Sequence, residues 1–270
     1  MNPDTWTVPR IRALKGKQRF ACLTAYDYPT ARMVDRSGVP LILVGDSLGA
    51  NVLGFESSLP VTMEHMLHHA AAVVRGVEQA VVVADMPYMS FQVSVSRAVE
   101  NAGRFIQAAG VDAVKLEGGQ VRVPTIAALV DNGIPVLSHI GLTPQSIREM
   151  GGYRVQGRSA ESADQLIADA CAVADAGSFA VVLECVPPQL GEKITESISV
   201  PTIGIGAGPA CDAQILVLSD LLGLTEGHVP KFARQYATLA VDIQNAVQSY
   251  VADVVSGAFP APEHTYSPDA

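Results

Sequence analysis

Acidic side chains stand at the ends of apolar segments that have the composition of buried β-strands. Asp46 and Asp85 each follow a run of aliphatic residues, and Glu184 closes another such run. Lys115 and Glu117 lie two residues apart at the end of a fourth. Burying a lone carboxylate is costly, so the same placement on successive strands predicts one site where these charges meet a metal or one another.

The alternation of side chains along a strand indicates which of these residues share a face. Lys115 and Glu117 have the same parity, so both can point to the interior, and Cys185 must point away from the side that Glu184 takes. His139 ends the strand-like segment that begins at Pro135. The early parts of these strands carry no such polar residues, which favours a functional site at one rim over a structural polar core.

Spacing alone leaves more than one role possible for these acids and for Lys115. Asp46 and Asp85 could bind a hard cation such as Mg²⁺, with Glu117 as a direct or water-bridged third ligand. Alternatively, the acids could simply pair with Lys115 and structural arginines. Lys115 could also hold a substrate carboxylate, and Glu184, on a strand further along the chain, suits a general base.

The order of segments predicts a (β/α)₈ TIM barrel with an extra N-terminal helix. Eight strand-like runs recur along the chain, at Phe20–Asp27, Leu41–Ser47, Ala80–Met86, Ala113–Gly118, Pro135–Gly141, Phe179–Val186, Pro201–Gly208 and Gln214–Ser219. Four amphipathic segments with a polar start or a glycine stop lie between them, at Thr62–Arg75, Ser94–Ala109, Val123–Asn132 and Ala160–Ala176. Strand and helix alternating in this way over about 250 residues is typical of the barrel.

The ends of the chain are interpreted separately. Val8–Lys17 is expected to form the extra helix, and Lys231–Ser256 is long enough for the eighth helix of the barrel and an extension. No linker divides the chain, so residues 1–270 are predicted to form a single domain with a loose Pro-rich tail at about 258–270. A doubly wound sheet is the competing architecture, but it rarely needs eight evenly spaced units.

Composition excludes several classes of protein. Of 270 residues, 49% are hydrophobic and 17% charged, which fits a well-buried α/β enzyme and argues against disorder. A net charge of −9 disfavours nucleic-acid binding. No apolar run reaches the roughly 20 residues that span a bilayer, and no secretory signal is visible at the N-terminus, so a cytoplasmic protein with reduced cysteines is expected.

Other motifs are weaker. Gly204–Gly208 follows a strand and could cradle a phosphate, but a tight turn explains it equally, because Pro209 breaks the dinucleotide-binding pattern. His65 and His69 are four residues apart and could bind a metal, but without a third ligand nearby an exposed or interface position is favoured.

Read in order, ten short segments resemble the ketopantoate hydroxymethyltransferase family. They are Thr24–Tyr28, Val44–Gly49, Leu59–Thr62, Asp85–Met89, Val114–Gly119, His139–Ser146, Gly151–Gly157, Leu183–Pro187, Ile203–Gly208 and Gly227–Phe232. The resemblance extends from about Arg19 to Pro260. The ordered set is specific, although single pieces such as Ile203–Gly208 are not.

The resemblance implies transfer of a hydroxymethyl group from 5,10-methylenetetrahydrofolate to 3-methyl-2-oxobutanoate, giving 2-dehydropantoate for pantothenate and coenzyme A synthesis through a magnesium-stabilised enolate. It implies a magnesium-dependent homo-oligomer, often a decamer. The carried-over metal ligands are Asp46, Asp85 and Glu117. The carried-over substrate contacts are Asp46, Ser47, Asp85 and Lys115; His139 is expected to hydrogen-bond in the same pocket, and Glu184 is the proton acceptor.

Two alternatives stay open. One is a folate-independent, magnesium-dependent enzyme that makes or breaks a C–C bond beside a 2-oxo acid, as in the isocitrate lyase and phosphoenolpyruvate mutase group. The other is a non-catalytic metabolite-binding barrel, which is disfavoured because Glu184 and both aspartates are intact.

Overall fold

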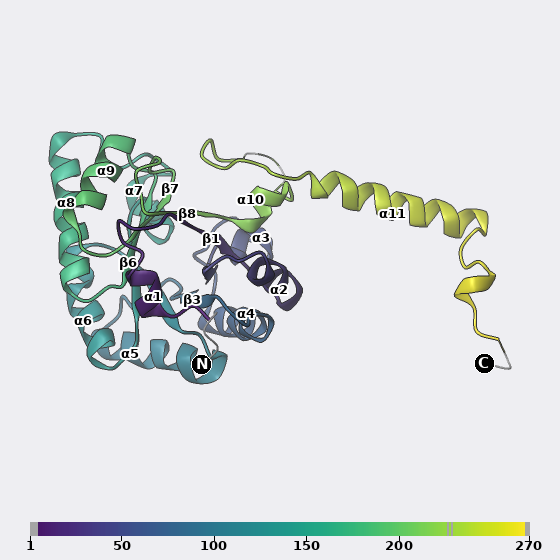
Figure 1. Ribbon diagram of the computed structural model, residues 1–270, viewed down its shortest axis with the longest axis horizontal. Helices are drawn as coiled ribbons and strands as arrows, with labels where there is room; N and C mark the ends of the chain where they lie inside the picture. Colours follow the sequence, from purple (N-terminus) through teal and green to yellow (C-terminus); the bar gives the residue numbers. More distant parts are fainter. Residues whose placement is uncertain (1–4, 226, 228, 268–270) are drawn as a thin grey trace. The chain divides into compact units, whose positions relative to one another are not determined.

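The structure, a computed structural model, describes residues 5–225, 227 and 229–267 and contains a closed barrel of eight parallel strands (Figure 1). The strands are β1 (Phe20–Thr24), β2 (Leu41–Val44), β3 (Val81–Asp85), β4 (Ala113–Glu117), β5 (Val136–Gly141), β6 (Ala180–Glu184), β7 (Thr202–Ile205) and β8 (Ala213–Leu216). Each strand pairs with the next in sequence, and β8 pairs with β1. The predicted (β/α)₈ barrel and all eight predicted strands are therefore confirmed.

Burial explains why these segments form strands. Every residue of β2, β3, β4 and β7 is buried, so their near-continuous aliphatic composition reflects a sheet covered on both faces. The register sets the polar ends of neighbouring strands level with one another: Asp85 is opposite Lys115, and Glu117 is opposite His139. One rim of the barrel thus collects the residues that the sequence singles out.

Helices follow most strands, and the four predicted ones are present. They are α4 (Met63–Gly76), α5 (Val95–Arg104) continued by the π-helical turn η1 (Phe105–Ala109), α6 (Val123–Asp131) and α8 (Ala160–Asp175). Thr62, Ser94 and Ser159 cap α4, α5 and α8, as small polar residues do at helix N-termini.

Two helices of the barrel were not among those predicted, α2 (Tyr28–Arg36) and α9 (Pro188–Ser197). The signal for α2 is local: the Asp27 carboxylate accepts a hydrogen bond from the Thr30 amide, and a proline lies in the first turn. The shorter elements α3 (Leu48–Asn51), η2 (Gln120–Arg122), η3 (Pro144–Ser146) and α7 (Ile147–Met150) lie in the connections after β2, β4 and β5.

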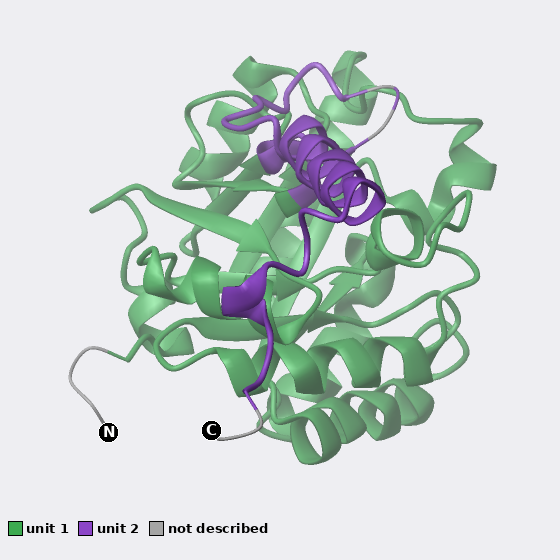
Figure 2. Ribbon diagram, turned by 90° about the vertical axis from the view of Figure 1, so that its right-hand side faces the viewer, with its two compact units in different colours: residues 1–218 green, residues 219–270 purple. Residues whose placement is uncertain are grey.

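The chain divides into two compact units, residues 1–218 and residues 219–270 (Figure 2). The first holds the barrel. The second holds most of α10 (Leu218–Leu222), then α11 (Leu239–Ser256) and η4 (Pro262–His264). The helix predicted over Lys231–Ser256 therefore begins only at Leu239, and a single domain over the whole chain stays a prediction. Residues 268–270 of the tail lie outside the described residues.

None of the helices within the described residues has both the length and the hydropathy needed to cross a membrane. The longest described helix, α11, runs for 18 residues and includes Asp242 and Asp253.

The extra N-terminal helix is shorter than predicted. Helix α1 spans Val8–Arg12, and turns continue to Lys17. The side chain of Ile11 is fully buried, and the loop that follows reaches the amino ends of β7 and β8. This N-terminal segment therefore lies against the floor of the barrel, the end at which β7 and β8 begin.

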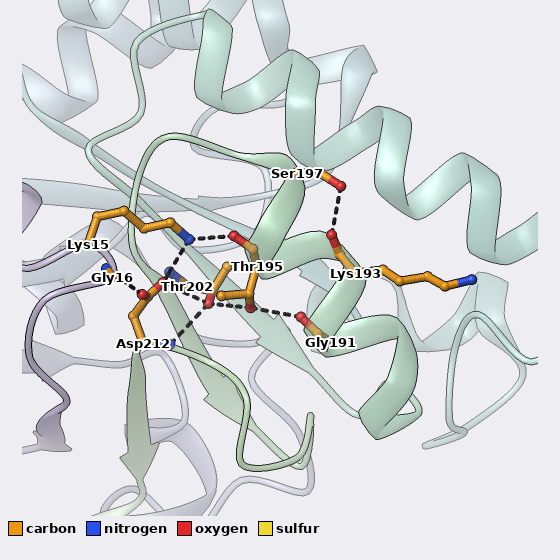
Figure 3. Close-up of polar contacts among 8 residues, drawn as sticks. All are labelled: Lys15, Gly16, Gly191, Lys193, Thr195, Ser197, Thr202 and Asp212. Atoms are coloured by element: carbon orange, nitrogen blue, oxygen red, sulfur yellow. Dashed lines mark hydrogen bonds and ion pairs between the residues drawn. The ribbon is translucent and has the colours of Figure 1, made fainter.

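A partly buried ion pair fixes this loop to the floor (Figure 3). Lys15 Nζ lies 2.9 Å from Asp212 Oδ2, and the Asp212 carboxylate also accepts hydrogen bonds from the Gly16 and Thr202 amides. Burial alone would raise the pKa of Asp212, but the hydrogen bonds from Thr202 and Gly16 and the charge of Lys15 outweigh it and lower the pKa below its ordinary value. Asp212 therefore connects the N-terminal loop to two strands of the barrel.

We expect Asp212→Asn to lower the free energy of unfolding by about 3 kcal/mol at pH 7, because Lys15 loses its partner in a mostly buried site. A carboxylate with a lowered pKa stabilises the fold above its ordinary pKa and loses that contribution as pH falls. The gap between wild type and variant, measured by urea denaturation, should therefore close below about pH 4.

The control is Glu64→Gln, which breaks the exposed pair between Glu64 and Arg104 at 3.1 Å and should cost less than about 1 kcal/mol. Equal losses for the two variants would contradict the role given to Asp212.

Candidate active site

The carboxyl ends of β2 to β6 bring together the polar side chains that the sequence predicts to share a site. Asp85, Lys115, Glu117 and His139 lie within β3, β4 and β5, and Asp46 comes two residues after β2. All five are buried, with exposed fractions of 5% or less. Glu184, at the end of β6, is the more accessible group, and its side chain is 16% exposed.

Asp85 is the centre of one half of the cluster. Its Oδ1 lies 2.5 Å from Lys115 Nζ, and its Oδ2 accepts a hydrogen bond from the Asp46 amide at 3.0 Å. Burial alone would lower the pKa of Lys115, but the charges of Asp85, Glu117 and Asp46 outweigh it and raise that pKa, so the ammonium form is strongly favoured. The ion pair predicted as an alternative to metal binding is therefore present.

One lysine does not neutralise the acids around it. Burial, together with the charges of Asp85 and Glu117, raises the pKa of Asp46 to about 7. The protein interior thus disfavours a negative charge on Asp46 near neutral pH when only these side chains compensate for it.

His139 lies between two glutamates in the other half of the cluster. Its Nδ1 is 3.5 Å from Glu117 Oε1 and its Nε2 is 3.2 Å from Glu184 Oε2, so each ring nitrogen faces one glutamate. Burial and Lys115 would lower the pKa of His139, but Glu117 and Glu184 raise it to about 9. An imidazolium therefore stands beside Glu184 at neutral pH.

Gln145 is a site residue that was not among those predicted. It lies in η3, after β5, and is 5% exposed. Its Nε2 donates to Asp46 Oδ2 at 3.0 Å, and its backbone amide donates to Glu117 Oε2 at 3.0 Å. The only sequence signal is its place in the segment His139–Ser146, because no strand parity brings a loop residue to the rim.

Two tyrosines also belong to this region. The Tyr26 hydroxyl and Ser47 Oγ are 2.9 Å apart, so the loops after β1 and β2 meet at the predicted substrate-contacting serine. Burial raises the pKa of Tyr153, and Glu184, Asp46 and Glu117 raise it further, which places this phenol within the field of the acids although its residue is 69% exposed. The loop after β5 therefore borders the carboxylate cluster.

The weaker motifs do not join the cluster. Gly208 has a φ of +86°, and a Cβ there would lie 2.7 Å from the Cβ of Pro188, so a tight turn accounts for the Gly204–Gly208 segment. His65 caps α4, and His69 Nδ1 lies 2.6 Å from the Tyr26 carbonyl oxygen. All four cysteines are free thiols, as expected.

The side chains at the rim fit a hard cation. Four carboxylates face one ammonium and one imidazolium, so the ionised cluster keeps a net negative charge that a divalent ion would offset. Among the described residues, no three His, Cys, Asp or Glu side chains form a ready-made metal cage. Magnesium needs no such cage, since it is usually held by one or two carboxylates together with water and substrate oxygens. Asp46 and Asp85 supply oxygen donors of this kind.

Comparisons with known proteins agree on one family. The model of the family described as ketopantoate hydroxymethyltransferase matches residues 5–262. The chain is 54% identical over 253 residues to 3-methyl-2-oxobutanoate hydroxymethyltransferase of Syntrophomonas wolfei, covering 94% of this chain and 92% of that one. It is 54% identical over 261 residues to the protein of the same name from Moorella thermoacetica, covering 96% and 97%.

A solved structure, the phosphoenolpyruvate phosphomutase of Streptomyces platensis subsp. rosaceus, resembles the chain with a TM-score of 0.60 and 18% identity, covering 97% of this chain and 92% of that one. At that identity the likeness establishes only the shared barrel.

Gly141 lies against the backbone of Glu184, and this close approach can be tested by substitution. Its φ is +93°, and a Cβ there would lie in steric overlap with the Glu184 carbonyl oxygen. We expect Gly141→Ala to lower the free energy of unfolding by about 1–3 kcal/mol more than Gly133→Ala does, because it adds overlap to the strain of a positive φ. Gly133 is the matched control, with a φ of +76° and open space around its Cβ position. Equal losses by chemical denaturation would show that the approach of Glu184 imposes no constraint.

Proposed function

The chain belongs to the ketopantoate hydroxymethyltransferase family, and from that membership we propose that it transfers a hydroxymethyl group to 3-methyl-2-oxobutanoate, with 5,10-methylenetetrahydrofolate as the one-carbon donor. The observation that carries the proposal is the family match over residues 5–262, and the acids expected from the sequence lie at one rim of the barrel, which agrees with it. The product would be 2-dehydropantoate.

Substrate binding is assigned to the half of the cluster around Asp85. Asp46 and Asp85 would hold Mg²⁺, with Glu117 completing the site, and the ion would supply Lewis-acid polarisation of the 2-oxo group. The Lys115 ammonium would bind the substrate carboxylate, since it is kept charged by the acids around it. The Ser47 hydroxyl, now 2.9 Å from the Tyr26 hydroxyl, would donate to the same carboxylate.

Proton transfer is assigned to Glu184. It is more exposed than the other acids, so a substrate in the barrel mouth can reach it. Glu184 would remove the proton from C3 of the keto acid, and the resulting enolate carbon would attack the methylene carbon of the folate. Both bonds from that carbon to the folate nitrogens break, water supplies the hydroxyl oxygen, and tetrahydrofolate leaves. His139 would hold the Glu184 carboxylate in place from 3.2 Å and balance its charge before the proton arrives.

The folate-independent alternative has less support. Solved structures with this barrel include phosphoenolpyruvate phosphomutase and oxaloacetate acetylhydrolase, but at 18% and 14% identity. Relatives at 54% identity carry the hydroxymethyltransferase name instead. A requirement for methylenetetrahydrofolate in product formation separates the two functions.

Self-association is proposed as well. Within its own unit, α11 leaves uncovered an apolar face formed by Ile243, Val247, Tyr250 and Val254, each between 45% and 57% exposed. Spacings of four, three and four residues place these side chains on one stripe of the helix. An uncovered stripe of this kind fits burial against a second copy of the chain, and a decamer is the assembly that the family resemblance implies.

The test of catalysis isolates the proton acceptor. Wild type with Mg²⁺ should exchange the C3 hydrogen of 3-methyl-2-oxobutanoate with D₂O in the absence of folate, and EDTA should abolish the exchange. Glu184→Gln keeps the shape of the side chain but cannot accept the proton, so exchange followed by NMR should fall about 10²–10⁴-fold.

Glu192→Gln, on the outer helix α9, is the control and should exchange as wild type does. Wild-type exchange by the Glu184 variant would assign the proton to another group, with His139 the first to be tested.

The test of assembly places one charge on either face of α11. Val247→Asp should raise the dissociation constant of the oligomer at least tenfold, because a contact worth about 1.5 kcal/mol or more is lost. Asn245→Asp adds the same charge outside the apolar stripe and should leave the assembly intact. Sedimentation velocity over a concentration series measures both, and a wild type that sediments as a monomer at every concentration would refute self-association.

A further inference from the structure

Gln145 touches both halves of the carboxylate cluster without being an acid or a base itself. Its side-chain Nε2 donates to Asp46 Oδ2, and its backbone amide donates to Glu117 Oε2, each at 3.0 Å. The same Nε2 donates to the Met86 carbonyl oxygen at 2.9 Å. One loop residue after β5 therefore holds groups at the carboxyl ends of β2, β3 and β4.

A second glutamine sets the orientation of this amide. Gln92 Nε2 donates to Gln145 Oε1 at 2.9 Å, and Gln92 Oε1 in turn accepts from the Phe91 amide at 3.3 Å. Both hydrogens on Gln145 Nε2 and its carbonyl oxygen are thus engaged. Turning the amide over would set its oxygen against Asp46 Oδ2 and the Met86 oxygen, so Gln92 selects the orientation that donates to Asp46.

We propose that Gln145, oriented by Gln92, is a positioning residue that holds Asp46 for cation binding. This inference rests on the proposed function, in which Asp46 and Asp85 hold the ion. A carboxylate that is fixed by a directed donor before the ion arrives loses less freedom on binding it. Partners that hold a metal ligand from behind typically contribute about 10–100-fold to metal affinity.

In this proposal Gln145 acts through Asp46 and does not touch the substrate. Its neutral amide leaves the charge of the cluster unchanged, whereas a lysine or arginine in its place would compete with the ion for the carboxylates. Burial to 5% exposure removes water as a substitute donor, so the loss of this amide leaves Asp46 Oδ2 without that hydrogen bond.

The experiment measures Mn²⁺ binding to the full chain without substrate, by electron paramagnetic resonance and calorimetry. Gln145→Met keeps the length of the side chain and removes both polar groups, and it should weaken Mn²⁺ binding about 10–100-fold. Gln92→Met leaves Gln145 in place but frees its amide to turn, so a smaller loss in the same direction is expected.

The matched control is Gln165→Met on α8. Gln165 Nε2 also donates to an aspartate, Asp169 Oδ1, at 3.2 Å, but on an outer helix. This variant should bind Mn²⁺ as wild type does. Thermal unfolding of all three variants without metal reports on the fold, and Gln92→Met carries the test if Gln145→Met does not fold.

The outcomes separate the two proposals. Wild-type affinity in folded Gln145→Met, or an equal loss in Gln165→Met, overturns the positioning role and leaves the proposed function standing. Absence of Mn²⁺ binding by wild type, with Mg²⁺ also failing to support C3 exchange, overturns the metal site and this inference with it. Weakened binding confined to the Gln145 and Gln92 variants supports both.

Discussion

The concentration of carboxylates at one rim of a buried barrel is the constraint on which the rest of the structure depends. Four acids gather where β2, β3, β4 and β6 end, and three of them are 5% exposed or less. Burial makes each charge costly, so the surroundings must offset it. The positive charge of Lys115 offsets that of Asp85, and His139 lies between Glu117 and Glu184 and offsets part of their charge. The raised pKa of Asp46 marks the charge that these cations leave uncompensated.

The barrel separates that costly arrangement from the contacts that hold it together. At the opposite rim, Asp212 forms an ion pair with Lys15 and accepts hydrogen bonds from the amides of Gly16 and Thr202. Its lowered pKa shows that these contacts stabilise the ionised carboxylate. The functional rim keeps unsatisfied polar atoms instead, including both ring nitrogens of His139. Stability and reactivity therefore occupy opposite rims of the same barrel, as in other barrels of this class.

Strand residues were predictable from the sequence because two regular rules place them. Apolar runs predicted the eight strands. The alternation of side chains along a strand predicted that Lys115 and Glu117 share a face, and both contribute to the cluster. Loop residues obey no such rule. Gln145 reaches Asp46 from 99 positions away, and Gln92 reaches Gln145 from another loop, so only the closed barrel reveals them. The start of α11 was missed for a related reason, since composition alone did not mark where the helix begins.

The chain shares its barrel with several solved proteins that are named as phosphomutases or hydrolases, at 14–18% identity. The fold by itself therefore does not determine which reaction a barrel catalyses. What distinguishes one chemistry from another must lie in side chains that shape the cluster and in the loops beside it. In this chain the loop after β5 supplies both kinds of residue: Gln145, which holds two of the acids, and Tyr153, whose phenol stands in their field at the open side. The fold thus sets where the acids stand, while one loop of this chain adds a donor to two of them and a phenol within their field.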